Sequence, residues 1–520
     1  MSRLIYEYVA VIGIDGMGIF NRQADTPCID KIFENGASTY GALSMNPTIS
    51  AENWGAMLLG ADPLVHGLTN SIVGRTLYTN KNLPSVFSRL RKAFPDAPLA
   101  SFCNWNPINH GIVEHDENVV LETADNDEIL CDKIVRYVEN KPKFLFVQFD
   151  NVDGAGHGNG YGTKGHLDQI SKADALTGRI FEAYEKAGII DDTLFIVTAD
   201  HGGIRNGHGG YTDEEKFVFL AARGKGVEKG EIGFAKTKDI AAIVLYALGL
   251  DVPEYCEKGF SSQIPDGIFP EISGTYRRTQ SKPFIPENIP TPPIDGEGGL
   301  YSFFPAEKLK LAMFFDNSVE DATGKVKLTQ HNLVKYYSEG VRGSFGEMGA
   351  TGYVTADSIS FGKESFTLAA WLKIDRTLDE PPVICTNKNF FWKNRNEKGF
   401  ALAIRGGGIL FDFGNGDDHD DVLTPYPEEI SDGWLHTAVT LDTEKKELRV
   451  YYNFKFIRAF AMDEEFLIDF DCGPFTVGND SCGVYNNETY RLLFNIDDFF
   501  VFSGAFTQED VENLAQYYSM

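Results

Sequence analysis

The feature that most constrains the fold is the alternation of apolar, strand-like runs with helical stretches over about the first 250 residues. The strand-like runs are YVAVIGID (8–15), FLFVQFD (144–150), TLFIVTAD (193–200) and KFVFLAA (216–222), and the helical stretches cover 26–35, 166–187 and 237–249. Strands separated by helices imply a mostly parallel sheet sandwiched by helices. We therefore predict an α/β fold for this part, with its ligand crevice at the carboxyl ends of the strands.

The pattern changes after residue 261. Residues 262–300 are rich in Pro and Gly and predict an extended linker. From residue 301 onward, short runs with period-two alternation are separated by turn residues, as in SFTLAAWLKI (365–374). Such runs are typical of an all-β, jelly-roll sandwich. The predicted organisation is an α/β domain over 1–261, a linker over 262–300 and an all-β domain over 301–520.

Charge limits the partners of this chain. The formal net charge of -28 disfavours a nucleic-acid polymer or an anionic membrane surface as a ligand. No apolar run is long enough to span a bilayer, so we expect no membrane insertion. A small phosphate ester can still bind where a bound cation reverses the local field.

The expected location is the cytoplasm. The N-terminal residues lead directly into a strand and lack the features of a signal peptide. The seven cysteines are scattered without a CxxC pair, which disfavours both a disulfide framework and a thiolate zinc site. Secretion is the alternative if a signal has been removed.

Acidic residues follow three of the predicted strands: Asp15, the pair Asp150 and Asp153, and Asp200. A single Asp at such a place commonly caps the next helix. Because parallel strands end at the same edge of a sheet, these acids can also converge on one site.

Three histidines lie close to these acids and change the interpretation. His157 is four residues after Asp153 in NVDGAGHGNG, a stretch that we expect to be too rich in glycine to hold a helix. His201 directly follows Asp200, and His208 lies seven residues later. Carboxylate and imidazole ligands without thiolates suit Zn, Mn or Fe(II). The candidates exceed the three or four ligands of one catalytic ion, so we expect two ions.

The order of motifs between residues 8 and 250 resembles the alkaline phosphatase superfamily. A strand ending in Asp is followed by a hydroxyl residue that begins a helix closing with Gly60-x-x-Pro63, then by Asp-x-x-x-His and by Asp-His-Gly. The nucleotide pyrophosphatase/phosphodiesterase branch and the sulfatases share this layout. Sulfatases also need a Cys/Ser-x-Pro-x-Arg context, and Ser50-Ala51-Glu52-Asn53-Trp54 lacks both the Pro and the Arg.

The resemblance implies two divalent metal ions, zinc in the first place and manganese as the alternative. It assigns Asp15, Ser50, Asp200 and His201 to one ion and Asp153, His157 and His208 to the other. Ser50 would be the nucleophile, with Thr48 as the alternative, and Asn70 would contact a phosphoryl oxygen. Asn53 and Trp54 are candidates for substrate contact. In the phosphodiesterase branch the last ligand usually lies much further downstream than His208.

The C-terminal part resembles laminin G or concanavalin A-like jelly rolls. The matching stretches are FTLAAWLKI (366–374), SDGWLHTAVTLD (431–442) and IDDFFVFSGAFTQEDVENL (496–514). The resemblance implies a carbohydrate or a protein as a ligand, or a domain that only packs against its neighbour. Phe390, Phe391 and Trp392 either stack on a sugar or belong to the core.

The residues and the resemblance together predict a two-metal hydrolase of phosphate esters with a phosphoseryl intermediate, and the resemblance to the phosphodiesterase branch alone implies that it acts on diesters. A phosphomonoesterase, a phosphomutase and a phosphonate hydrolase of the same superfamily are the enzymatic alternatives, and a sulfatase fits less well. The non-enzymatic alternative is a glycan- or protein-binding protein whose metal core is vestigial.

Overall fold

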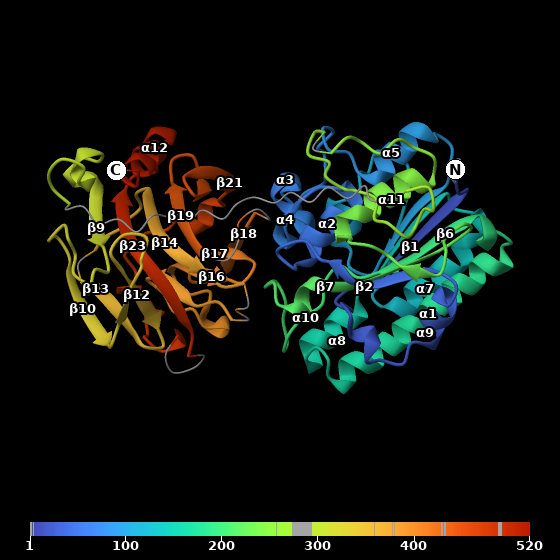
Figure 1. Cartoon of the computed structure of the whole chain (residues 1–520), viewed down its shortest axis with the longest axis horizontal. Coiled ribbons are helices and arrows are strands. Elements are labelled where there is room, and N and C mark those ends of the chain that lie inside the picture. The colour runs from blue at the N-terminus through green and yellow to red at the C-terminus, as the bar shows by residue number, and fades with distance from the viewer. Residues whose placement is uncertain are drawn as a thin grey trace. The chain divides into compact units, whose positions relative to one another are not determined.

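The computed structural model describes residues 3, 5–255, 257–272, 294–357, 359–376, 378, 380–427, 430, 433–486 and 491–519. The chain forms two compact units, Met1–Thr279 and Gln280–Met520 (Figure 1). Residues 273–293 of the predicted linker lie outside the described residues, so the predicted linker bounds stay a prediction. No helix in the described ranges is both long enough and apolar enough to cross a bilayer.

The N-terminal unit is built on one mixed sheet. In the order of their pairing, its eight strands within the described residues are β4 (Val120–Thr123), β3 (Leu99–Cys103), β5 (Phe144–Phe149), β1 (Tyr8–Ile14), β6 (Thr193–Thr198), β7 (Phe217–Arg223), β2 (Ala37–Leu43) and β8 (Gly230–Glu231). The strands from β4 to β6 pair in parallel, and only β7 runs antiparallel to both of its neighbours. Strands β5 and β6 are fully buried apolar runs, as is usual in a parallel sheet covered on both faces. The predicted α/β fold is confirmed.

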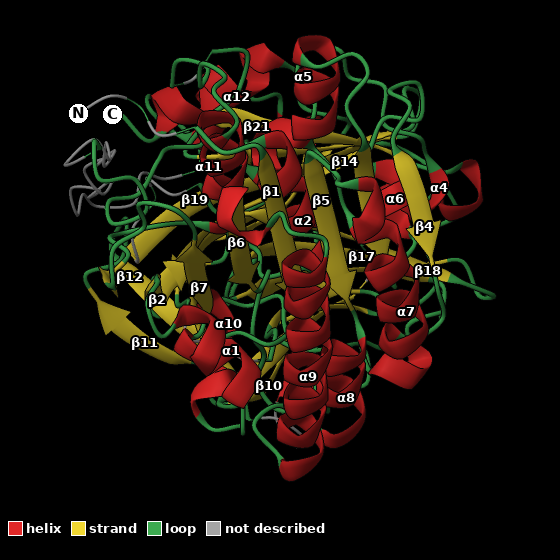
Figure 2. Cartoon of the chain, turned by 90° about the vertical axis from the view of Figure 1, so that its right-hand side faces the viewer, coloured by secondary structure: helices red, strands yellow, loops and turns green. Residues whose placement is uncertain are grey.

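Helices cover both faces of this sheet (Figure 1). On one side lie α2 (Ser50–Leu59), α5 (Val86–Ala93) and α11 (Ile240–Ala247), and on the other α1 (Pro27–Phe33), α7 (Asp127–Tyr137), α8 (Asn151–Asn159) and α9 (Lys164–Lys186). Figure 2 shows β1 at the centre, between β5 and β6. The register pairs Ile14 with Phe149 and Gly13 with Thr198, so the residues that follow these three strands meet at one edge of the sheet.

Helix α8 corrects one expectation, because residues 151–159 form a helix despite their glycines. Gly154 and Gly158 have open space where a Cβ would lie, whereas a Cβ on Gly156 would come within 2.6 Å of the Tyr161 ring. The helix packs against α9, and packing of this kind routinely overrides intrinsic propensity. The helical geometry places Asp153 and His157 on the same face.

The C-terminal unit is a sandwich of two antiparallel sheets. Among the described residues, the first sheet consists of β10 (Lys327–Asn332), β13 (Gly352–Asp357), β22 (Phe475–Val477), β15 (Val383–Thr386), β16 (Gly399–Arg405), β17 (Gly408–Gly414) and β18 (His419–Pro425). The second sheet consists of β11 (Lys335–Ser338), β12 (Ser344–Gly349), β23 (Leu493–Ser503), β14 (Phe366–Ile374), β19 (Gly433–Asp442), β20 (Glu447–Tyr452) and β21 (Lys455–Ala461), with β9 (Leu309–Met313) also paired to β23. The predicted jelly-roll sandwich is confirmed.

Two hydrophobic layers stabilise this sandwich. The larger lies between the sheets and includes Phe366, Phe400 and Phe499. The smaller covers the outer side of the second sheet, where α12 (Gln508–Tyr517) contributes Val511 and Leu514. Of the aromatic residues considered for sugar stacking, Phe390 is buried, and the rings of both Phe390 and Phe391 contact Tyr485. The side chain of Trp392 lies outside the described residues.

A buried ion pair ties β17 to the loop after β15. Lys388 Nζ lies 2.5 Å from Asp412 Oδ1, and both side chains are inaccessible to solvent. Asp412 Oδ2 also accepts a hydrogen bond of 2.7 Å from Arg395 Nε. Replacement of one partner leaves the other charge buried and uncompensated, which is strongly destabilising.

We expect Asp412→Asn to lower the free energy of unfolding of the C-terminal unit by about 3–5 kcal/mol, because Lys388 then keeps a buried charge without its carboxylate. Urea unfolding of the full chain measures this change. The matched control is Glu464→Gln, which breaks the exposed pair with Lys446 and leaves the unfolding midpoint unchanged. Equal midpoints for the two variants would contradict the expectation.

Candidate metal centre and active site

The seven residues predicted as metal ligands converge in the structure. Asp15 directly follows β1, Asp200 and His201 follow β6, and Asp153 and His157 lie on α8 after β5. Ser50 is the first residue of α2, and His208 comes from the loop after His201. Two groups of ligand atoms lie close enough together to share an ion, Asp15–Asp153–His201 and Asp153–His157–His208.

The first half of the site, which we call half-site A, consists of Asp15, Ser50, Asp200 and His201. His201 Nε2 lies 3.5 Å from Asp15 Oδ1, 3.3 Å from Asp200 Oδ2 and 3.2 Å from Ser50 Oγ. All four residues are buried, and Asp200 and His201 are completely inaccessible. Half-site A is therefore part of the protein interior.

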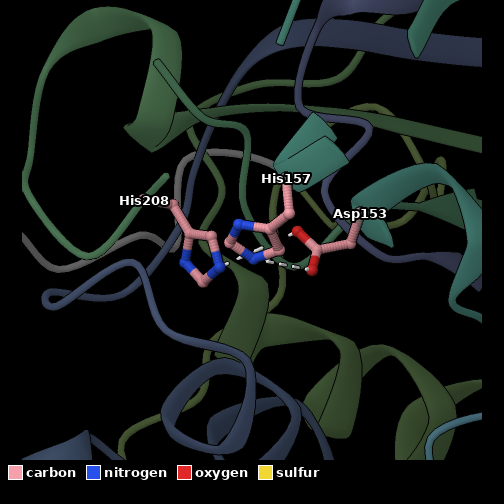
Figure 3. Close-up of side chains that lie close together, drawn as sticks. All are labelled: Asp153, His157 and His208. Carbon is pink, nitrogen blue, oxygen red and sulfur yellow. Dashed lines mark ion pairs between the residues drawn. The ribbon is translucent and has the colours of Figure 1, made fainter. Parts of the chain in front are cut away.

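The second half, half-site B, consists of Asp153, His157 and His208 (Figure 3). Asp153 Oδ2 lies 3.2 Å from His157 Nε2, and Asp153 Oδ1 lies 3.7 Å from His208 Nε2. The His157 side chain is 47% exposed, so solvent reaches this half of the site. The His201 and His208 rings stack with centroids 3.8 Å apart and connect the two halves.

All three histidines present the same nitrogen to the site. His157 Nδ1 contacts Asn206 O at 2.8 Å, His201 Nδ1 contacts Gly202 O at 2.8 Å and His208 Nδ1 contacts Thr48 O at 2.7 Å. A carbonyl oxygen can only accept, so each Nδ1 carries the proton and donates it. In neutral His201 the Ser50 hydroxyl then donates to Nε2. Fixing Nδ1 in this way is what metal-ligating histidines require.

The carboxylates carry charge that the polypeptide does not neutralise with Lys or Arg. Within the described ranges, Asp15, Asp153 and Asp200 have ion pairs only with histidines. Asp15 Oδ1 and Asp200 Oδ2 are buried and have no hydrogen-bond partner among the residues that the structure describes. Burial, and after it the charges of Asp200 and Asp153, raises the pKa of Asp15 well above its usual range. Burial and the charge of Asp153 do the same to the pKa of Asp200.

Half-site B has a different electrostatic balance. Burial raises the pKa of Asp153, but the hydrogen bond from His157 and the charges of His208 and His201 outweigh it and bring this pKa below its usual range. The hydrogen bond to Asp153 raises the pKa of His157 to about 9. Burial and the charge of His201 lower the pKa of His208 to about 3.

The hydroxyl candidates are placed differently. Ser50 stands at the N-terminus of α2 with its Oγ toward His201. Thr48 is fully buried, where its Oγ1 donates to Gly210 O and accepts from Gly209 N, both at 2.9 Å. The geometry therefore favours Ser50 as the reacting hydroxyl and gives Thr48 the role of holding the loop that carries His208.

Asn70 lies beside the start of α2. Its Oδ1 accepts a hydrogen bond of 3.0 Å from Ala51 N, next to Ser50, while its side chain is exposed at the start of α4 (Asn70–Arg75). Its Nδ2 has no hydrogen-bond partner among the described residues, so it is available to an anion at the helix N-terminus.

Asn53 and Trp54 differ from the predicted substrate contacts, because both are completely buried. Asn53 uses both ends of its amide to hold the segment before Ser50, accepting from Met45 N at 2.6 Å and donating to Pro47 O at 3.0 Å. Trp54 Nε1 donates to Asp15 Oδ2 at 2.9 Å. Asn53 thus holds the segment before Ser50 in place, and Trp54 holds the Asp15 carboxylate.

Three residues that contact the candidate ligands were not predicted from the sequence. Gln148 Nε2 donates to Asp15 Oδ2 and to Asp150 Oδ1, both at 2.9 Å. Tyr161 donates its hydroxyl to Asp153 Oδ1, and Asn206 contacts His157. Gln148 is a polar residue inside the apolar run FLFVQF, which is a readable signal. Tyr161 and Asn206 have no comparable signal in the sequence.

The comparisons with known proteins agree with both resemblances. The family model of type I phosphodiesterases / nucleotide pyrophosphatases matches residues 100–214, and the model of the concanavalin A-like lectin/glucanases superfamily matches residues 348–512. Residues 100–214 of the N-terminal unit are thus similar to the type I phosphodiesterase family, and residues 348–512 of the C-terminal unit are similar to the concanavalin A-like superfamily.

Particular relatives are similar over shorter stretches. A 2,3-bisphosphoglycerate-independent phosphoglycerate mutase of Campylobacter jejuni is 30% identical over 132 residues, which are 24% of this chain and 25% of the relative. A multifunctional alkaline phosphatase superfamily protein, PehA, of Trinickia caryophylli is 32% identical over 97 residues, or 17% of this chain and 19% of the relative. The chain thus spans a quarter or less of the length of these relatives.

Among solved structures, the binding domain of Paraclostridial mosquitocidal protein 1 has a TM-score of 0.34 at 16% identity, covering 41% of this chain and 53% of that one. The binding domain of botulinum neurotoxin DC in complex with rat synaptotagmin II has a TM-score of 0.33 at 17% identity, covering 41% and 52%.

We expect the apparent affinity of the metal-free protein for its second zinc ion to rise with pH, by about tenfold per unit up to about pH 9. A metal ion at His157 Nε2 displaces the proton that gives this group its pKa of about 9. Calorimetric titration at several pH values, in buffers of different ionisation enthalpy, measures both the affinity and the protons released.

His157→Gln is the control, since it removes this proton release. Zinc binding at pH 7 without proton release in the unmodified protein would contradict the assignment. In the metal-free protein, the raised pKa of His157 contributes stability that is fully present below its ordinary pKa of 6.5 and is lost as the pH rises through about 9.

Proposed function

We propose that this protein is a two-metal hydrolase of phosphate diesters with Ser50 as its nucleophile. One observation carries the proposal: three carboxylates and three imidazole Nε2 atoms lie together, and one of these imidazoles, His201, contacts the Ser50 hydroxyl at the start of a helix. The match of residues 100–214 to the type I phosphodiesterase family supports it.

The donor set fits two divalent cations, zinc or manganese. Asp15, Ser50, Asp200 and His201 would hold one ion, and Asp153, His157 and His208 the other. Asp15 Oδ1 and Asp200 Oδ2 are buried and accept no hydrogen bond from the described residues, so a cation bound here would offset the cost of burying them. Two such cations lower the pKa of a coordinated hydroxyl and offset the charge of the phosphoryl group.

The polypeptide supplies the nucleophile and the geometry. Ser50 loses its hydroxyl proton to solvent, Oγ forms a bond to phosphorus, and the bond from phosphorus to the leaving oxygen breaks; the leaving oxygen takes up a proton from solvent and departs as the alcohol. The N-terminus of α2 and Asn70 Nδ2 hold phosphoryl oxygens during this step, while the Ala51 amide keeps its hydrogen bond to Asn70 Oδ1. Water then attacks the phosphoseryl ester, breaks the bond between Ser50 Oγ and phosphorus, and releases a phosphate monoester.

The charge of the site supports a diester as the substrate. A phosphate monoester is dianionic at neutral pH, and its extra charge calls for a cationic side chain in addition to the metal ions. Among the described residues, the three candidate carboxylate ligands are ion-paired with histidines and not with Lys or Arg. A singly charged diester needs less positive charge.

A phosphomutase is the second candidate, on the similarity to phosphoglycerate mutase over 132 residues. A mutase and a hydrolase share the phosphoseryl step and differ in the acceptor, which is a hydroxyl of the substrate in one and water in the other. Products formed with a phosphoglycerate as the substrate distinguish them, because a mutase yields an isomer and a hydrolase yields inorganic phosphate.

Ser50→Ala should abolish diester hydrolysis, by about 10³-fold or more, because no other hydroxyl is placed to replace the nucleophile. The measurement is the release of nitrophenol from bis(nitrophenyl) phosphate by the metal-loaded protein. Ser71→Ala, in the exposed part of α4, is the control and retains full activity. Full activity of Ser50→Ala would move the role to Thr48.

The unmodified protein should hydrolyse bis(nitrophenyl) phosphate at least about tenfold more efficiently, in kcat/KM, than nitrophenyl phosphate, a difference of about 1.4 kcal/mol in transition-state stabilisation. Nitrophenyl sulfate should react more slowly than either. A preference for the monoester would retain the site and exclude the diesterase assignment.

A further inference from the structure

Three hydrogen bonds hold the loop that carries His208 to helix α8 and to Tyr161, which follows this helix. Tyr161 N donates to Arg205 O at 2.6 Å, and His157 Nδ1 donates to Asn206 O at 2.8 Å. In return, Asn206 Nδ2 donates to His157 O at 3.0 Å. A tight turn closed by Ile204 N to Gly207 O, at 2.9 Å, presents Asn206 for these contacts.

Tyr161 connects the same two segments through its side chain. Its hydroxyl donates to Asp153 Oδ1, and its ring lies against Gly156 of α8 and Gly203 of the loop. A Cβ on either glycine would come within 2.6 Å of ring atoms, so only glycine allows this approach. The ring also contacts His157 and His208 edge to face, with centroids 6.0 Å and 6.4 Å away.

The two half-sites therefore depend on different parts of the fold. Half-site A is formed by the ends of β1 and β6 and by the start of α2, all inside the protein core. Half-site B joins α8 to an external loop in which Arg205 and Asn206 are exposed. Thr48 holds the His208 end of this loop, and the contacts with Tyr161 and His157 hold its Arg205–Asn206 end to the helix that carries Asp153 and His157.

We propose that Tyr161 and Asn206 are positioning residues that assemble half-site B, so that loss of either yields a protein that holds one metal ion tightly and the second weakly. This inference rests on the proposed two-metal function. Tyr161 fixes the Asp153 carboxylate, and the Asn206 side chain donates to the His157 backbone carbonyl, which keeps the Asn206 backbone carbonyl in place to accept from the His157 ring. Half-site A keeps Asp15, Asp200 and His201 without them.

The test is a titration of the metal-free full-length protein with cobalt(II), followed by visible absorption and by calorimetry. The unmodified protein should bind two equivalents. Tyr161→Phe, which keeps the ring on both glycines and removes only the hydroxyl, should bind the first equivalent with unchanged affinity and spectrum. Its second equivalent should bind about 10- to 100-fold more weakly, with an altered spectrum.

Tyr184→Phe is the matched control, since it removes a buried hydroxyl that has no hydrogen-bond partner among the described residues and lies on α9, away from the ligands. It should bind both equivalents as the unmodified protein does. Asn206→Ala is the second test variant and should repeat the effect of Tyr161→Phe. Thermal unfolding of each metal-free variant reports whether the fold is intact.

The outcomes separate this inference from the proposed function. Two equivalents bound with wild-type affinity by both Tyr161→Phe and Asn206→Ala would overturn the positioning role and leave the two-metal function standing. Equal weakening of both equivalents would overturn the assignment to half-site B. Binding of no metal by the unmodified protein would overturn the proposed function itself.

Discussion

The burial of Asp15 and Asp200 at the ends of two strands, with the partly buried Asp153 beside them on α8, is the constraint on which the rest of the site depends. A buried carboxylate without a partner of opposite charge is unfavourable, and the described residues pair these three with histidines only. Hydrogen bonds from Trp54 and Gln148 hold Asp15 but satisfy only one of its oxygens. The remaining acceptors face one another around His201, which is the arrangement that a bound cation stabilises.

The parallel order of β5, β1 and β6 is what makes this arrangement possible. Adjacent parallel strands end at the same edge, so residues more than a hundred positions apart in the sequence arrive within contact distance. Helix α2 then brings Ser50 from outside the sheet to the same edge, with its N-terminal amides in place. The sheet provides the negative charge and the helix provides the groups that bind an anion.

The parts of this structure that are readable from the sequence are those fixed by periodicity or by residue type. Continuous apolar runs such as FLFVQF predicted buried parallel strands, and the pairing of acids with nearby histidines predicted that these side chains lie close together. Helix α8 was missed because glycine lowers helix propensity, while packing against α9 and against the ring of Tyr161 decides the conformation.

The direction in which individual side chains point could not be predicted from the sequence. Asn53 and Trp54 lie within one turn of Ser50, yet on a helix buried on all sides this proximity does not place them in the site. The Asn53 amide instead hydrogen-bonds to the backbone of Met45 and Pro47, and the Trp54 indole donates to the Asp15 carboxylate. Tyr161 and Asn206 were invisible for a related reason, because their contacts cross between α8 and a loop that begins about forty residues later.

The difference in exposure between the two half-sites bears on the order of the chemistry. Ser50 lies in half-site A, which is closed to solvent, whereas His157 of half-site B is open to it. In the proposed reaction the phosphoseryl ester forms on the closed side, and the water that releases it has to arrive from the open side. A glycine-rich loop suits this place, since Gly203 lets it approach the ring of Tyr161 closely while His208 donates its Nδ1 proton to Thr48 O, two residues before Ser50.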